Sequence, residues 1–206
     1  MFALYLKIAF RNIWKNSTQS LTGIFGLAFG LACIIPALYW LRYEISYDRF
    51  YPDTEQIYRI YSFDKQTGKV NDQVSGILER KLHEQFPAMQ TTTSFFIEKN
   101  DCSTEGTPYI RLRTIFTDST FFSVFPQIIV GGDAWQSLQV VNNIVLTETV
   151  AVRLFGDVDK AIGQQVKSTR LVYDPPYIVT AVVKDPPPNT NLSFDAILSH
   201  EQIKEQ

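Results

Sequence analysis

The feature that most constrains this chain is a long apolar stretch near its N-terminus. From Ser17 to Leu41 the sequence runs for 25 residues without Asp, Glu, Lys, Arg or His. At about 1.5 Å of rise per residue, roughly 20 helical residues span the hydrocarbon layer of a bilayer. A buried helix of a soluble domain rarely stays uncharged over that length. The sequence therefore predicts a transmembrane helix over residues 17–43, on which the rest of the chain depends.

The charges and aromatic residues that flank this stretch give the helix a direction. Three basic residues precede it, and the first acidic residue of the chain is Glu44. Basic residues beside a span are retained on the cytoplasmic side, and aromatic residues favour both interfaces. We therefore expect a single span of the cell inner membrane, with the N-terminus cytoplasmic and the residues after Tyr43 periplasmic. The predicted interface residues are Lys7, Arg11, Trp14 and Lys15 on the inner side and Tyr39, Trp40 and Tyr43 on the outer side.

Small residues within the span suggest a surface for helix packing. Gly23, Gly26 and Gly30 lack side chains, and Gly26 and Gly30 have the four-residue spacing that lets two membrane helices approach closely. We predict that these three glycines face another helix. Glycine is also common in membrane helices in general, so ordinary membrane-helix composition is the alternative.

A cleaved signal peptide and a lipoprotein anchor are both disfavoured by the length of the apolar stretch and by its end. A signal peptide has a shorter apolar core and a cleavage site with small residues, whereas this stretch ends in Tyr39 and Trp40. Cys33 follows Gly30-Leu31-Ala32, which faintly resembles a lipoprotein cleavage box, but the apolar run continues beyond the cysteine. Cleavage is therefore not expected.

Residues 1–16 have the pattern of an amphipathic helix. Their apolar residues recur every three or four positions, while Lys7, Arg11 and Lys15 share another face. A basic amphipathic helix beside a span is expected to lie in the inner headgroup layer, with its lysines against anionic lipid. Membrane anchorage alone accounts for this pattern, and an additional contact with a cytoplasmic partner is the alternative.

Residues 44–206 are expected to form one extracytoplasmic domain of mixed α+β class. Residues 1–43 contain four of the 19 basic residues and no acidic residue, which leaves 15 basic and 21 acidic residues for the domain. This acidic balance disfavours nucleic-acid binding. The patterns predict strands at 56–63, 93–98, 110–116, 144–146 and 177–183, a short element at 119–125, and helices over 74–86 and from Thr147 to Gly156.

The sequence contains almost no signature of catalysis. The two histidines, His83 and His200, have no metal-ligand partner at a useful spacing, and no nucleophile motif or phosphate-binding loop occurs. Cys33 lies in the predicted span and Cys102 in the outer domain, so they cannot form a disulfide. We therefore expect no catalytic residue, no cofactor and no metal site.

Several separate stretches of the chain resemble one family, the MacB/FtsX-type permeases of ABC transporters. Each stretch is short, but together they follow the family's order over nearly the whole chain. The stretches are Tyr5–Asn16, Gly26–Ala32, Glu44–Phe50, Gln56–Arg59, Asp118–Phe125, Leu146–Gly156, Ala161–Gly163 and Val182–Pro187.

This resemblance implies a permease subunit that works as a dimer with a separate cytoplasmic ATPase, and a periplasmic adaptor is a further partner to be expected. In the family, the periplasmic core domain lies between the first and second spans, and ATP-driven motions reach it through the membrane. Relatives export macrolides and peptides, move lipoproteins or regulate cell-wall hydrolases. The chain resembles only the amino-terminal portion of such permeases, so we expect its domain to be incomplete at its C-terminal end. A truncated gene product, a fragment and one piece of a split permease are the alternatives.

Two hypotheses of function follow. The first is a permease component that couples a cytoplasmic ATPase to periplasmic export or mechanotransmission. The second is a single-span binding or sensory module whose outer domain recognises a ligand or an envelope protein. A sensor of this kind needs a cytoplasmic output, and only about 16 residues precede the predicted span, so the first hypothesis is favoured. A membrane-anchored enzyme lacks any nucleophile and base pattern.

Overall fold

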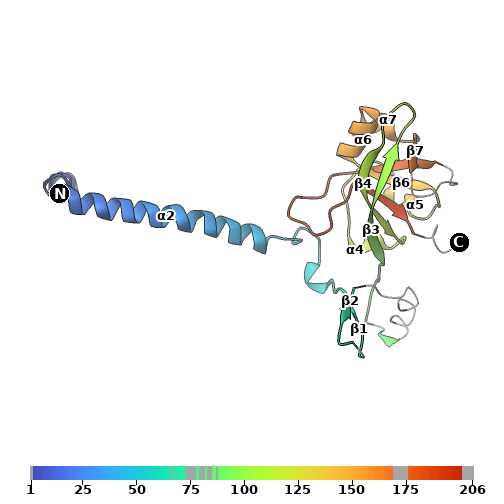
Figure 1. The fold of residues 1–206 in the computed structure, drawn as a ribbon, viewed down its shortest axis with the longest axis horizontal. Helices are drawn as coiled ribbons and strands as arrows, with labels where there is room; N and C mark the ends of the chain where they lie inside the picture. Colours follow the sequence, from blue (N-terminus) through green and yellow to red (C-terminus); the bar gives the residue numbers. More distant parts are fainter. Residues whose placement is uncertain are drawn as a thin grey trace. The chain divides into compact units, whose positions relative to one another are not determined.

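The computed structural model divides the chain into two compact units, Met1–Tyr47 and Asp48–Gln206 (Figure 1). It describes residues 2–65, 67–72, 78, 82, 85–86, 88–168 and 176–200.

The N-terminal unit consists of two helices, as the sequence predicts. Helix α1 covers Phe2–Lys15 and helix α2 covers Ser17–Ile45, and Asn16 between them has a non-helical backbone. Helix α2 continues through Pro36 for 29 residues and contains no buried residue. By length and composition it is the helix of the described chain that can cross a membrane.

The second unit, Asp48–Gln206, is called the outer unit here after its predicted location, and it is built around a closed β-barrel (Figure 1). The strand order is β5-β8-β6-β9-β4-β3-β7, and β7 also pairs with β8, so that six strands of the described chain close on themselves while β5 extends the edge of β8. Strands β4 and β9 are parallel, as are β6 and β8, and the other pairs are antiparallel. The strands are β3 Phe95–Ser103, β4 Ile110–Thr117, β5 Ile129–Gly132, β6 Asn143–Thr147, β7 Gln165–Ser168, β8 Tyr177–Val183 and β9 Ala196–Ser199.

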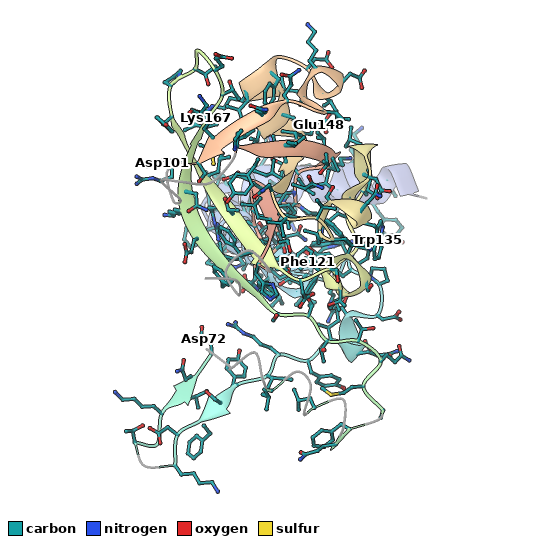
Figure 2. All side chains as sticks on the ribbon, turned by 90° about the vertical axis from the view of Figure 1, so that its right-hand side faces the viewer. Asp72, Asp101, Phe121, Trp135, Glu148 and Lys167 are labelled. Carbon is teal, nitrogen blue, oxygen red and sulfur yellow. The ribbon has the colours of Figure 1, made fainter. Side chains whose placement is uncertain are left out.

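Alternate residues of these strands supply two hydrophobic cores. One core takes residues from all six barrel strands and from helices α6, Glu148–Phe155, and α7, Val158–Ala161. The other takes the remaining faces of β4, β6, β8 and β9 and is covered by α4, Phe121–Val124, and α5, Ala134–Ser137. Figure 2 shows Phe121 among these packed side chains. The predicted mixed α/β class is therefore confirmed, and the barrel gives it a specific architecture.

The predicted strand over Gln56–Phe63 is wrong for most of its length. A short 3-10 turn covers Thr54–Gln56, and only Ser62–Phe63 forms a strand, β1, which pairs with β2 at Val70–Asn71. The alternating pattern was therefore not a sign of a half-buried strand: Tyr58 is 82% exposed and Phe63 is 62% exposed. Figure 2 marks this hairpin by Asp72, which pairs with Arg59.

The remaining predicted elements are mostly confirmed. Strand β3 begins within the predicted 93–98 stretch and runs five residues past it, to Ser103. Strands β4, β6 and β8 lie where they were predicted, and the short element after Ser119 is α4. The helix predicted over 74–86, with His83, lies mostly outside the described residues. Strands β5, β7 and β9 were not predicted.

Helix α6 agrees with its predicted ends but not with its predicted cap. Gly156 ends the helix with φ of 80°, the left-handed conformation that glycine adopts without strain. Thr147 is the N-cap residue, yet its hydroxyl makes no capping hydrogen bond. The carboxylate of Asp185 accepts instead from the backbone N–H of Thr149 at 3.2 Å and from its hydroxyl at 2.9 Å. A distant residue therefore performs the role that the sequence assigned to a local one.

Candidate functional site

The C-terminal end of helix α2 brings the predicted interface aromatics together. Tyr39 and Trp40 are 75% and 67% exposed, as side chains that face lipid headgroups would be. The indole N–H of Trp40 points to the carboxylate of Glu44 at 3.4 Å, and the rings of Tyr43 and Tyr47 meet edge to face at 5.9 Å. These contacts order the last turns of the helix up to Tyr47.

The inner predicted residues lie on helix α1 and at its end. Lys7, Arg11 and Lys15 are spaced four apart, so they share one helix face, and all three are exposed. Trp14 is 83% exposed. This arrangement suits a helix lying in a headgroup layer, and the roles of these residues stay predictions.

The three predicted packing glycines face one side of helix α2. At about 100° per residue, Gly23, Gly26 and Gly30 fall within an arc of about 60°. A methyl group built at any of them meets no atom within 4 Å. The N-terminal unit therefore has an open, smooth strip at these positions, and its packing against a second helix stays a prediction.

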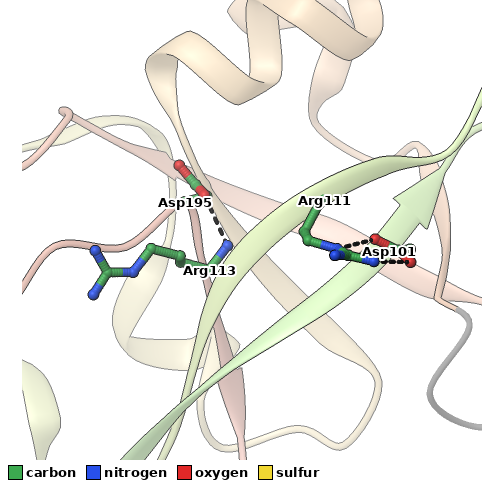
Figure 3. Close-up of polar contacts among 4 residues, drawn as sticks. All are labelled: Asp101, Arg111, Arg113 and Asp195. Atoms are coloured by element: carbon green, nitrogen blue, oxygen red, sulfur yellow. Dashed lines mark hydrogen bonds and ion pairs between the residues drawn. The ribbon is translucent and has the colours of Figure 1, made fainter.

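On the barrel, polar residues of β3 and β4 form hydrogen bonds and an ion pair that connect neighbouring segments (Figure 3). The guanidinium of Arg111 donates two hydrogen bonds to the carboxylate of Asp101, at 2.8 and 3.1 Å. Hydrogen bonding to Arg111 lowers the pKa of Asp101, and the same contact raises the pKa of Arg111. The backbone N–H of Arg113 donates to Asp195 at 2.7 Å, which ties β4 to the segment before β9. These residues stabilise the barrel and form no reactive arrangement.

A shallow hollow of about 270 Å³ lies over β8, beside helix α5. Three of its polar residues have side-chain partners within the fold, and no residue that lines it has a buried side-chain atom without a partner. The hydroxyl groups of Ser137 and Thr180 are 2.6 Å apart, and the carboxylate of Asp133 accepts from the first backbone N–H groups of α5. The hollow therefore has no unpaired buried group to hold a ligand, and we assign it no chemistry.

The described residues show no chemical group activated for catalysis. No cluster of three or more His, Cys, Asp or Glu side chains that could hold a metal ion occurs among them. The thiol of Cys102 is buried in the barrel core. Burial raises the pKa of this thiol from 9.0 to about 11, which keeps it protonated and unreactive at neutral pH.

The buried thiol makes stability depend on pH in the alkaline range. The unfolded chain, with an ordinary thiol pKa near 9.0, loses this proton before the folded chain does. The stabilisation is therefore complete below pH 9 and declines as the pH rises from about 9 to about 11, by roughly 2–3 kcal/mol. Urea unfolding at several pH values checks this, with Cys102→Ala as the control, in which the decline between pH 9 and 11 should be smaller by the contribution of the thiol. Equal pH dependence in both proteins would contradict the assignment.

The comparisons with known proteins agree with this architecture. A family model described as "MacB-like periplasmic core domain" matches residues 20–205. The chain belongs to this family. Its outer unit is therefore a MacB-type periplasmic domain, a non-catalytic part of ABC transporter permeases, and the predicted family resemblance is confirmed. No curated protein matches the sequence.

Two solved structures share the fold at low sequence identity, and a third is less similar. A domain of a permease-type protein from Porphyromonas gingivalis has a TM-score of 0.58 and 19% identity, over 65% of this chain and 56% of that one. The extracellular domain of the noncanonic ABC-type transporter YknZ from Gram-positive bacteria has a TM-score of 0.55 and 12% sequence identity. The match covers 71% of this chain and 74% of that one. The periplasmic region of MacB from Actinobacillus actinomycetemcomitans has a TM-score of 0.48 and 13% sequence identity. The match covers 74% of this chain and 62% of that one. The chain thus spans about 56–74% of the length of these relatives.

The structure also shows polar contacts that local sequence patterns do not reveal. The predicted site residues all lie in the N-terminal unit, on α1 and α2. In the outer unit, the carboxylate of Asp48, the residue with which that unit begins, accepts hydrogen bonds from Thr190 and Asn191. Asp48 lies in the stretch Glu44–Phe50 that carried the family resemblance, but its partners lie more than 140 residues away, so only the fold reveals its role.

Proposed function

We propose that the chain is a permease component of a MacB-type ABC transporter, which couples a separate cytoplasmic ATPase to work done by the outer domain. It would be anchored in the inner membrane by helix α2, with the N-terminus cytoplasmic and the barrel periplasmic. The observation that carries the proposal is the match to the MacB-like periplasmic core domain over residues 20–205, which includes most of the apolar helix.

The architecture supports a mechanical role for this chain. The outer unit has a closed barrel with two filled cores, and the described residues include no metal cluster and no activated nucleophile. A rigid domain on a membrane helix can move as a body when the helix moves. ATP hydrolysis would take place in the partner subunit, and a second permease copy, the remaining spans and a periplasmic adaptor would complete the transporter.

Co-purification tests the proposal directly. The full chain, tagged at its C-terminus, is expressed in its native membranes, extracted in mild detergent and captured. We expect mass spectrometry to find an ABC ATPase in the captured material. The control is the same chain with helix α2 replaced by an unrelated membrane span, and it should lose the ATPase. A chain that is inserted and folded but recovers no ATPase would contradict the proposal and favour a stand-alone binding module.

A further inference from the structure

We draw no further inference here: the strongest candidate, the surface patch of exposed apolar side chains on and beside the β1–β2 hairpin (Tyr58, Tyr61, Phe63 and Val70), carries nothing, because nothing in the structure shows what covers it.

Discussion

Replacement of Gly132 by alanine is expected to prevent the outer domain from folding. Gly132 ends strand β5 with φ of 76°, and a methyl group there would lie 2.1 Å from the carbonyl oxygen of Thr180 and 2.8 Å from the Cα of Ala181. Both obstructing atoms belong to the backbone of the neighbouring strand β8. No side-chain rotation can relieve this overlap, so the two strands have to separate.

The expected loss is large in comparison with total stability. The strained backbone alone costs on the order of 1 kcal/mol, and forced displacement of packed backbone costs several more. Domains of this size have about 5–15 kcal/mol of stability in total. The backbone N–H of Asp133, the N-cap residue of α5, donates to the same carbonyl oxygen of Thr180 at 3.3 Å, so separation at this point also disturbs the second core.

Circular dichroism and expression level measure this effect, and the chain offers a matched control. Gly106 has φ of 80° and no atom within 4 Å of an added methyl group. Gly106→Ala should lower stability by only about 1 kcal/mol and leave the fold intact. Comparable melting temperatures for Gly132→Ala and Gly106→Ala would show that β5 and β8 are not packed as described.

The elements that were predicted correctly are determined by residues within or next to them in the sequence. Helix α2 follows from one uncharged stretch, and the end of α6 follows from Gly156 and its left-handed backbone. Strands β4 and β8 are rich in branched and aromatic residues and end at turn-forming residues. In each case the decisive signal lies within about ten residues of the element.

The barrel could not be predicted, because its closure depends on distant pairs. Strand β9, Ala196-Ile197-Leu198-Ser199, is buried at every position, so it has no alternating pattern. Its partner β4 lies about 80 residues earlier in the chain. Conversely, the alternation over Gln56–Phe63 predicted a strand of eight residues, of which only Ser62–Phe63 pair with another strand, β2, among the described residues. The alternation of residues along a strand shows which of its faces is apolar. Pairing with strands distant in the sequence decides whether that face is buried.

The same limit applies to the candidate site. The interface residues and glycines of the span follow from local composition and length, and they stay predictions about a lipid environment. The contacts of Asp48 cross 142 residues to Thr190, so no local pattern contains them. In the sequence, Asp48 is simply a polar residue that follows a predicted span. Only the fold brings the loop with Thr190 and Asn191 next to it.

Two arginines in the middle of helix α2 are expected to remove the chain from the membrane. Leu31 is the central residue of Ser17–Ile45, and Leu27 lies one turn before it on the same face. An arginine at the centre of a span raises the free energy of insertion by about 3 kcal/mol relative to leucine, so the pair Leu27→Arg and Leu31→Arg costs roughly 6 kcal/mol. Such a change is large enough to reverse the insertion of a single span.

The experiment uses the full chain with alkaline phosphatase at its C-terminus, an enzyme that becomes active only outside the cytoplasm. The wild type should be phosphatase-positive and resist carbonate extraction, and so should the matched variant Leu27→Ala with Leu31→Ala, which shortens the same side chains without adding charge. The arginine pair should lose both properties. If the wild-type fusion is inactive, or if the arginine pair stays as firmly in the membrane as the alanine pair, then helix α2 is not a span with its basic end inside. The proposed periplasmic location of the barrel would then fail, and with it the proposed coupling to a cytoplasmic ATPase.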